Sequence, residues 1–230
     1  MIINNININN FNATLLSRDI QVANVTTFIG WLDNSTSPIK LKEEKFKFSP
    51  IGVKLLVEGN NEQEVLTNIS NIIIKCKSGE LKFTDMDYYY NVTVESYSNK
   101  KIIDKAYELE ITFKSDYKYK PQIIETMNRL TTKTINVIGN TETPCIVEIT
   151  PSVDAIDLTV NGLGDDPIII KNLKQNKKII INESTVLQEG TNKFMDTDMW
   201  DFPKLKPGSN TITLSKNTMD VNIKYKGRWI

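Results

Sequence analysis

The 230-residue sequence contains no histidine. This absence excludes Ser/His and Cys/His catalytic arrangements, imidazole metal ligands and the usual side-chain pH switch near neutrality. Only two cysteines are present, Cys76 and Cys145, which is too few for a disulfide framework or a cysteine zinc site. We therefore expect two buried, reduced thiols and no cofactor or metal. Any catalysis would have to use carboxylates, lysine or tyrosine.

Neither sign of charge is in excess, because 28 basic residues balance 28 acidic ones. Such a chain produces no overall field that would favour nucleic acid or an anionic membrane. No apolar run approaches the roughly 20 residues that cross a bilayer. The first ten residues, MIINNININN, also lack the basic start and apolar stretch of a signal peptide. We expect a soluble protein made in a cytoplasm, without specific nucleic-acid binding and without a membrane partner.

One stretch, Asn60–Lys77, has the apolar spacing of a helix. Asn61 and Glu64 supply a capping start, and Gly79 supplies a stop. Its apolar face consists of Val65, Leu66, Ile69, Ile72, Ile73 and Cys76. A single half-buried helix needs a sheet to lie on, so this segment predicts a helix packed against strands.

Every other periodic stretch alternates with the period of a strand, as in Tyr107–Phe113. We predict a mainly β protein of two domains: residues 1–130, a β-sandwich-like domain with one α-helix, and residues 131–230, a galectin-like or jelly-roll β-sandwich. The polar residues 122–134 are expected to connect the domains. Thr27–Asp33 is expected to be a strand, and Ser98–Lys101 a hairpin loop.

The sequence resembles the distal tail proteins (Dit) of siphophages, the hub subunits at the tip of non-contractile tails. The segments that carry the resemblance are Leu81–Asp85, Tyr88–Val94, Glu110–Phe113, Gly139-Asn140 with Pro144, Lys178–Asn182, Asp201–Asn210 and Asp220–Trp229. The family usually has an Asp-Pro-Tyr turn near the end of its first domain, and here Asp116-Tyr117 lacks the proline. All of these motifs are structural, and none is catalytic.

The resemblance implies a hexameric ring, closed by the first domain, that joins the tail tube to the tail-tip or receptor-binding proteins and lets DNA pass. It also implies a location at the virion tail tip after synthesis in the host bacterial cytoplasm. On this interpretation the protein is not an enzyme. The interface candidates are Trp31, Tyr88, Tyr89, Tyr90 and Tyr97, because tyrosine and tryptophan are enriched at subunit interfaces.

Acidic groups offer weaker candidates for chemistry. Asp196, Asp198 and Asp201 could cup a Ca²⁺ ion, but they lack the spacing and glycine of an EF-hand, which favours a solvated loop. Asp165-Asp166 follows two glycines and is typical of a turn rather than a glycosidase pair. Glu43-Glu44, among lysines, indicates a solvated strand face.

The exposed aromatic residues leave a second function class open. Trp31, Trp200 and the cluster Tyr88–Tyr90 could stack against sugars, which would make the chain a carbohydrate-binding β-sandwich adhesin. Family members that bind sugar generally carry an inserted module, and this chain has no such insertion. Binding to glycans or cell wall would distinguish the adhesin from the structural hub.

Overall fold

The computed structural model describes residues 1–26, 29–39 and 46–230. The chain divides into two compact units, Met1–Lys118 with Ile230, and Tyr119–Trp229. The division therefore falls at residues 118 and 119, before the segment 122–134 that the sequence suggested as the connection. Within the described residues, no helix has the length and apolar character needed to cross a membrane.

The first unit is built on a single antiparallel sheet in the order β2-β1-β7-β8-β9-β6-β3. Alternate residues of its long strands point inward and form one core with the helix. The bounds are β1 Ile2–Ile3, β2 Ile6–Asn7, β3 Ala13–Ile20, β6 Ser49–Glu58, β7 Ser78–Lys82, β8 Tyr89–Ile103 and β9 Ala106–Tyr119, with a 3₁₀ turn at Ile8–Phe11.

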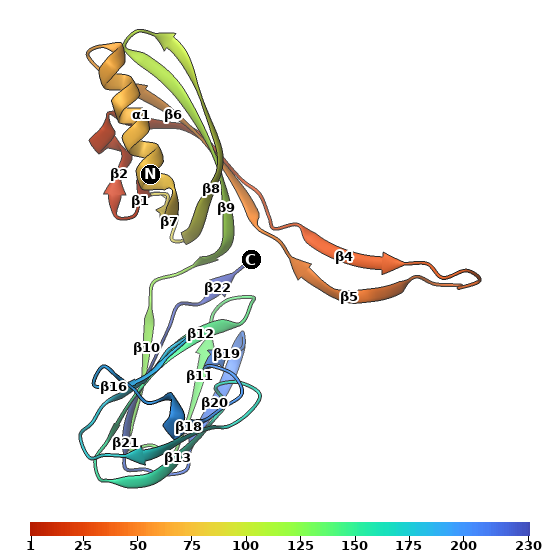
Figure 1. Ribbon diagram of the computed structural model, residues 1–230, viewed down its shortest axis with the longest axis vertical. Helices are drawn as coiled ribbons and strands as arrows, with labels where there is room; N and C mark the ends of the chain where they lie inside the picture. Colours follow the sequence, from red (N-terminus) through yellow and green to blue (C-terminus); the bar gives the residue numbers. More distant parts are fainter. The chain divides into compact units, whose positions relative to one another are not determined.

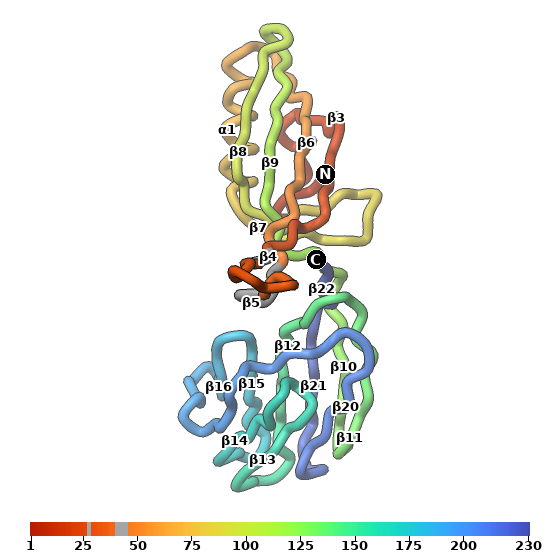
Figure 2. The backbone as a smooth tube through the Cα atoms, turned by 90° about the vertical axis from the view of Figure 1, so that its right-hand side faces the viewer, coloured from red at the N-terminus to blue at the C-terminus, as the bar shows by residue number. Residues whose placement is uncertain are grey.

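Helix α1 spans Glu62–Cys76 and lies along one face of this sheet, beside strands β8 and β9 (Figures 1 and 2). The Asn61 side chain accepts a hydrogen bond from the Glu64 backbone N–H at 3.0 Å, as the capping pattern predicts. Glu64 reaches back to the Asn60 backbone N–H at 2.9 Å. The buried residues are Val65, Ile69, Ile72 and Cys76, whereas Leu66 is partly exposed.

Gly79 follows the helix with a φ of +137°, and it does more than stop the helix. A Cβ atom placed there would lie 1.9 Å from Oδ1 of Asn4. The Asn4 amide fills this space: it donates to the carbonyls of Lys75 and Ser78 and accepts from the Glu80 N–H at 2.9 Å. Gly79 thus lets the N-terminal segment fasten the end of the helix to strand β7.

The expected hairpin loop at Ser98–Lys101 is wrong, because strand β8 continues through it to Ile103. The turn consists of Asp104 and Lys105, which follow the end of the strand at Ile103. The cause is exposure: residues Glu95–Ile103 of β8 are all exposed. A strand that is exposed to solvent on both faces has the polar composition of a loop.

Strands β4 (Val25–Gly30) and β5 (Ile39–Phe46) pair with each other and form a two-stranded hairpin (Figure 1). The expected strand Thr27–Asp33 therefore ends at Gly30, and Trp31 begins the connection to β5. The predicted strand face at Glu43-Glu44 lies outside the described residues.

The second unit has two facing sheets whose inner side chains form one core. One sheet has the order β10-β21-β12-β15-β16-β17, with β19 pairing β12, and the other has the order β11-β20-β13-β14-β18. The bounds are β10 Ile123–Asn128, β11 Thr132–Val137, β12 Thr143–Pro151, β13 Ala155–Asn161, β14 Ile168–Leu173, β15 Ile179–Ile181, β16 Val186–Gln188, β17 Thr191–Asn192, β18 Thr197–Asp198, β19 Lys204–Leu205, β20 Gly208–Leu214, β21 Met219–Tyr225 and β22 Arg228–Trp229.

Residues 122–134 belong to this sandwich as β10 and the start of β11, so their expected role as a connection is wrong. Their polar composition reflects the edge position of both strands: Met127 is fully buried while its neighbours Thr126 and Asn128 are both exposed. An edge strand with one buried anchor shows little periodicity.

Both cysteines are buried free thiols, Cys76 in the first core and Cys145 in the second. Burial raises the pKa of each thiol to about 12. Since thiolates rather than thiols react, both side chains act as small apolar core residues.

Candidate interaction surfaces

Several apolar side chains are exposed among the described residues of the β4–β5 hairpin and its ends. Trp31 is 67% exposed in the connection between the strands. The other exposed large apolar residues on the hairpin and its ends are Val22, Val25, Ile29, Leu32, Ile39, Phe46 and Phe48. Exposed apolar patches are typical of interaction sites, so the hairpin is a candidate interaction surface. Of these residues, only Trp31 is among the predicted interface candidates, although Leu32 lies beside it and a Ser/Pro-rich segment follows.

The predicted interface residues fall into two groups. Trp31 and Tyr97 are well exposed, whereas Tyr88 and Tyr89 are half-buried. The Tyr89 hydroxyl lies 3.0 Å from Nζ of Lys82, whose ammonium also lies 4.5 Å from the ring centroid.

Tyr90, the remaining member of the predicted set, is a core residue. It is 3% exposed and packs edge-on against Phe83, with ring centroids 6.0 Å apart. Burial also raises the pKa of its hydroxyl. Tyr90 and Val92 are both buried on the inward face of β8, so Tyr90 offers no surface to a partner.

Strand β8 also presents a free edge. Strand β7 pairs with it only from Tyr89 to Thr93. From Glu95 to Ile103, no strand among the described residues pairs with this side of β8. Tyr97, Ile102 and Ile103 are exposed along it. Unpaired backbone N–H and C=O groups on such an edge can accept a strand from another chain.

The sheet face opposite helix α1 is predominantly acidic. Strand registers and burial place seven carboxylates and three lysines on it: Asp19, Lys54, Glu58, Glu80, Lys82, Glu95, Glu108, Glu110, Lys114 and Asp116. Lys54 contacts Glu110 at 2.5 Å, and Lys114 contacts Glu95 at 2.8 Å. The lysines are thus largely neutralised, and the net charge of this face is negative.

The acidic groups considered for metal binding or catalysis do not assemble into such a site. Asp196 accepts hydrogen bonds from Lys193 at 2.7 Å and Asn172 at 2.9 Å. Asp165 pairs with Lys206 at 2.7 Å. In the part of the chain that the structure describes, no three acidic or cysteine side chains converge on a possible metal position.

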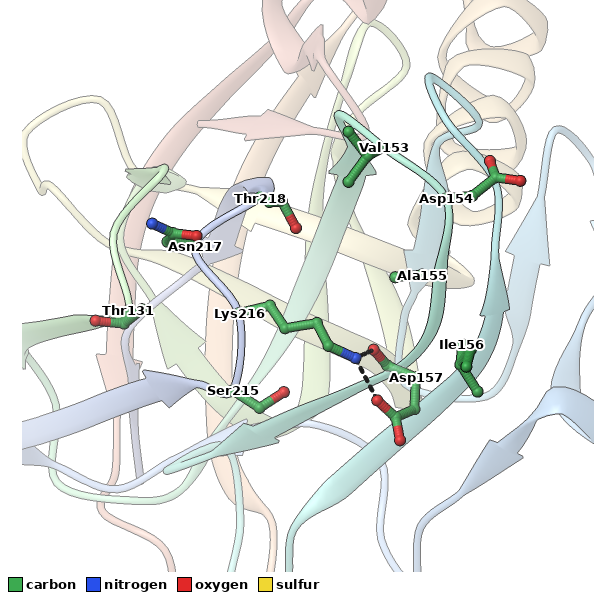
Figure 3. Close-up of a pocket in the computed structure, with 10 residues that line it drawn as sticks. All are labelled: Thr131, Val153, Asp154, Ala155, Ile156, Asp157, Ser215, Lys216, Asn217 and Thr218. Atoms are coloured by element: carbon green, nitrogen blue, oxygen red, sulfur yellow. Dashed lines mark hydrogen bonds and ion pairs between the residues drawn. The ribbon is translucent and has the colours of Figure 1, made fainter.

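Figure 3 shows a shallow cavity of about 660 Å³ in the second unit, lined by three turns. Lys216 reaches across it to both the backbone oxygen and the carboxylate of Asp157. Asp154 on its rim pairs with Lys174 at 3.0 Å and accepts from the Gln175 N–H at 2.7 Å. The charged side chains of the cavity are therefore used to hold the turns together.

Comparison with known proteins gives a family match for part of the chain. Residues 138–229 match the family model described as the siphovirus-type tail component, C-terminal domain. None of the curated protein sequences matches the chain.

Solved structures share the fold of the entire chain. The Dit protein of phage SPP1, described as a paradigm of hub adsorption apparatus in phages infecting Gram-positive bacteria, superposes with a TM-score of 0.82 at 10% identity, covering 100% of this chain and 98% of that one. A chain of the phage P2 baseplate in its activated conformation with Ca superposes with a TM-score of 0.52 at 15% identity, over 95% of this chain and 92% of that one.

The predicted resemblance to the distal tail proteins is confirmed for the fold of the whole chain. The family model adds sequence evidence for the second unit. Residues 138–229 are thus similar to the C-terminal domain of siphovirus-type tail components, and the whole chain has the fold of SPP1 Dit.

Proposed function

We propose that this protein is the hub subunit of a phage tail tip, and that its first unit closes a hexameric ring through which DNA passes. The observation that carries the proposal is the exposed apolar hairpin β4–β5 on a unit whose own core is already complete. A hub protein such as SPP1 Dit, which has the same fold, supplies the setting in which such a surface would be covered.

A closed ring needs two different surfaces on each copy, because every interface joins unlike patches. The first unit offers both: the apolar hairpin and the free β8 edge from Glu95 to Ile103. We infer that the hairpin of one copy covers apolar surface of its neighbour. The number six, the tail tube above the ring and the tail-tip or receptor-binding protein below it follow from the family resemblance, as does the location at the virion tail tip.

We further infer that the acidic sheet face lines the ring. DNA must slide past the wall, and each lysine or arginine that pairs with a phosphate adds salt-dependent affinity that would retard it. Seven carboxylates against three lysines, two of them in ion pairs with carboxylates, favour passage. We therefore expect no retention of duplex DNA at physiological salt, measured by gel shift. Tight binding would contradict this assignment of the lumen.

Size-exclusion chromatography with light scattering, followed by negative-stain microscopy, tests the ring directly. The proposal predicts six-copy particles with a central hole, whose population rises with protein concentration. A protein that stays monomeric at every concentration reached, alone and with its tail partners, would contradict it.

A carbohydrate-binding adhesin remains the second candidate function. The observation that favours it is Trp200, which is 86% exposed in the second unit and far along the chain from the hairpin. Sugar-competed binding to cell walls, by a protein that forms no ring, would favour the adhesin over the hub. We assign the chain no enzymatic role.

A further inference from the structure

Trp200 occupies a loop that is anchored on both sides. Its neighbours Met199 and Phe202 pack against the core of the second unit. Strand β18 ends just before the loop and pairs with β14, while β19 begins just after it and pairs with β12. The Pro203 carbonyl accepts from the Cys145 N–H at 3.0 Å, and the Lys204 N–H donates to the Leu163 carbonyl at 3.0 Å. The indole is thus exposed to solvent on a loop whose backbone is anchored at both ends.

Polar side chains with spare hydrogen-bonding capacity follow the indole. Nζ of Lys204 lies 3.4 Å from the Asp201 carboxylate and 3.4 Å from the Glu142 carboxylate. These two carboxylates raise the pKa of Lys204, so its ammonium stays charged. Each carboxylate has acceptor sites beyond its one long ion pair, and the ammonium has three donors.

We propose that Trp200, Asp201, Lys204 and Glu142 form a carbohydrate-binding site on the second unit. A sugar ring presents an apolar C–H face and a rim of hydroxyls that both donate and accept. The indole supplies a flat apolar platform, and the carboxylates and lysine supply partners for the hydroxyls. The turn just before the indole also exposes Phe194 and Met195, so binding of a protein partner is an outcome that the test separates from sugar binding.

This site is independent of ring closure, since it uses none of the first unit's surfaces. The test begins by applying the purified full-length protein to an array of defined oligosaccharides. Binding of the best-retained oligosaccharide is then measured by calorimetry and by tryptophan fluorescence.

Trp200→Ala should weaken binding about tenfold or more, and Trp200→Phe should weaken it less, because a smaller aromatic platform remains. Glu142→Gln should weaken binding severalfold through one hydroxyl contact. The matched control is Ile156→Ala, which removes another strongly exposed apolar side chain of the second unit, away from the Trp200 loop, and should leave sugar binding unchanged. Light scattering on each variant separates an effect on sugar binding from an effect on assembly.

Three outcomes would overturn the proposal. One is that the array retains no oligosaccharide and that calorimetry detects no binding with a Kd of about 1 mM or tighter. Another is a Trp200→Ala variant that binds as tightly as the parent. The third is a Trp200→Ala variant that changes only the oligomeric state or the capture of a tail protein, which would make the loop a protein interface.

Discussion

The two units solve the problem of burying a sheet in different ways. The second places two sheets face to face, so each sheet buries its inner side against the other. The first covers one face of its sheet with helix α1 and leaves the other face, a strand edge and a hairpin to solvent. We infer from this comparison that the core of the second unit needs no partner, while the uncovered sheet face, strand edge and hairpin of the first unit are the surfaces available for assembly.

Breaking the hairpin surface should have the largest effect. In the double variant Trp31→Glu, Leu32→Glu, two exposed apolar side chains become charged. Burial of such side chains contributes about 1.5–3 kcal/mol each, so we expect assembly to weaken at least roughly a hundredfold. Light scattering should show a monomer with an unchanged melting temperature.

The control for the hairpin variant is Met195→Glu in the second unit. Met195 is 94% exposed, so it matches the hairpin residues in exposure and in the charge introduced. Assembly equal to the parent is expected. Either loss of assembly in the Met195→Glu variant or unchanged assembly in the hairpin variant would contradict the assignment of ring closure to the first unit.

Within the first unit, Gly79→Ala should be the most damaging small substitution. The new Cβ would collide with the Asn4 amide. The alanine would also have to adopt a φ of +137°, which L residues rarely do. We expect a loss of about 2–3 kcal/mol in unfolding free energy, measured by calorimetry.

Asn4→Ala tests the same contact from the other side. It removes the three hydrogen bonds and also places alanine at the φ of +49° that Asn4 adopts, while Gly79 stays unchanged. The collision in Gly79→Ala and these hydrogen bonds share the Asn4 amide, so the double variant should lose less than the sum of the single ones. Strict additivity would show that Gly79 and Asn4 act independently.

The second unit can be tested at the Pro207-Gly208 turn, where Gly208 has a φ of +88°. The Asn210 side chain braces this turn by donating to the Lys206 carbonyl at 2.7 Å. Gly208→Val should destabilise the unit by about 1–3 kcal/mol. Gly208→Asn is the control, because asparagine tolerates positive φ. An unchanged melting transition for the valine variant would refute the turn assignment.

Acidification should affect the second unit through a smaller term. Glu148 accepts from Lys224 at 2.5 Å, and this bond lowers the pKa of its carboxyl below the ordinary 4.5. Its stabilisation is therefore present above pH 4.5 and is lost as the pH falls through the lowered value. Glu148→Gln should remove about 1 kcal/mol near pH 7 and flatten the acid limb of stability against pH. An acid limb identical to the parent's would exclude this contribution.

How much of this architecture the sequence predicts depends on alternation. Helix α1, the β6 and β9 strands and the mainly β fold follow from residues such as Val65 and Leu109, whose spacing shows which side is buried. The hairpin surface does not follow, because apolar residues such as Leu32 lie among polar ones without a period. Likewise, the exposed end of β8 has no buried residues and so shows no alternation, and β10 has only Met127 as a fully buried residue. Apolar residues on a surface that binds a partner are exposed in the single chain, so periodicity alone assigns them to the core or to no element.

The central claim is that residues of the first unit close the ring. Light scattering on two fragments, residues 1–118 and 119–230, across a concentration series tests it most directly, with the full-length chain as reference. We predict that residues 1–118 assemble and that residues 119–230 stay monomeric. Assembly of residues 119–230, with residues 1–118 folded and monomeric at high concentration, would contradict it.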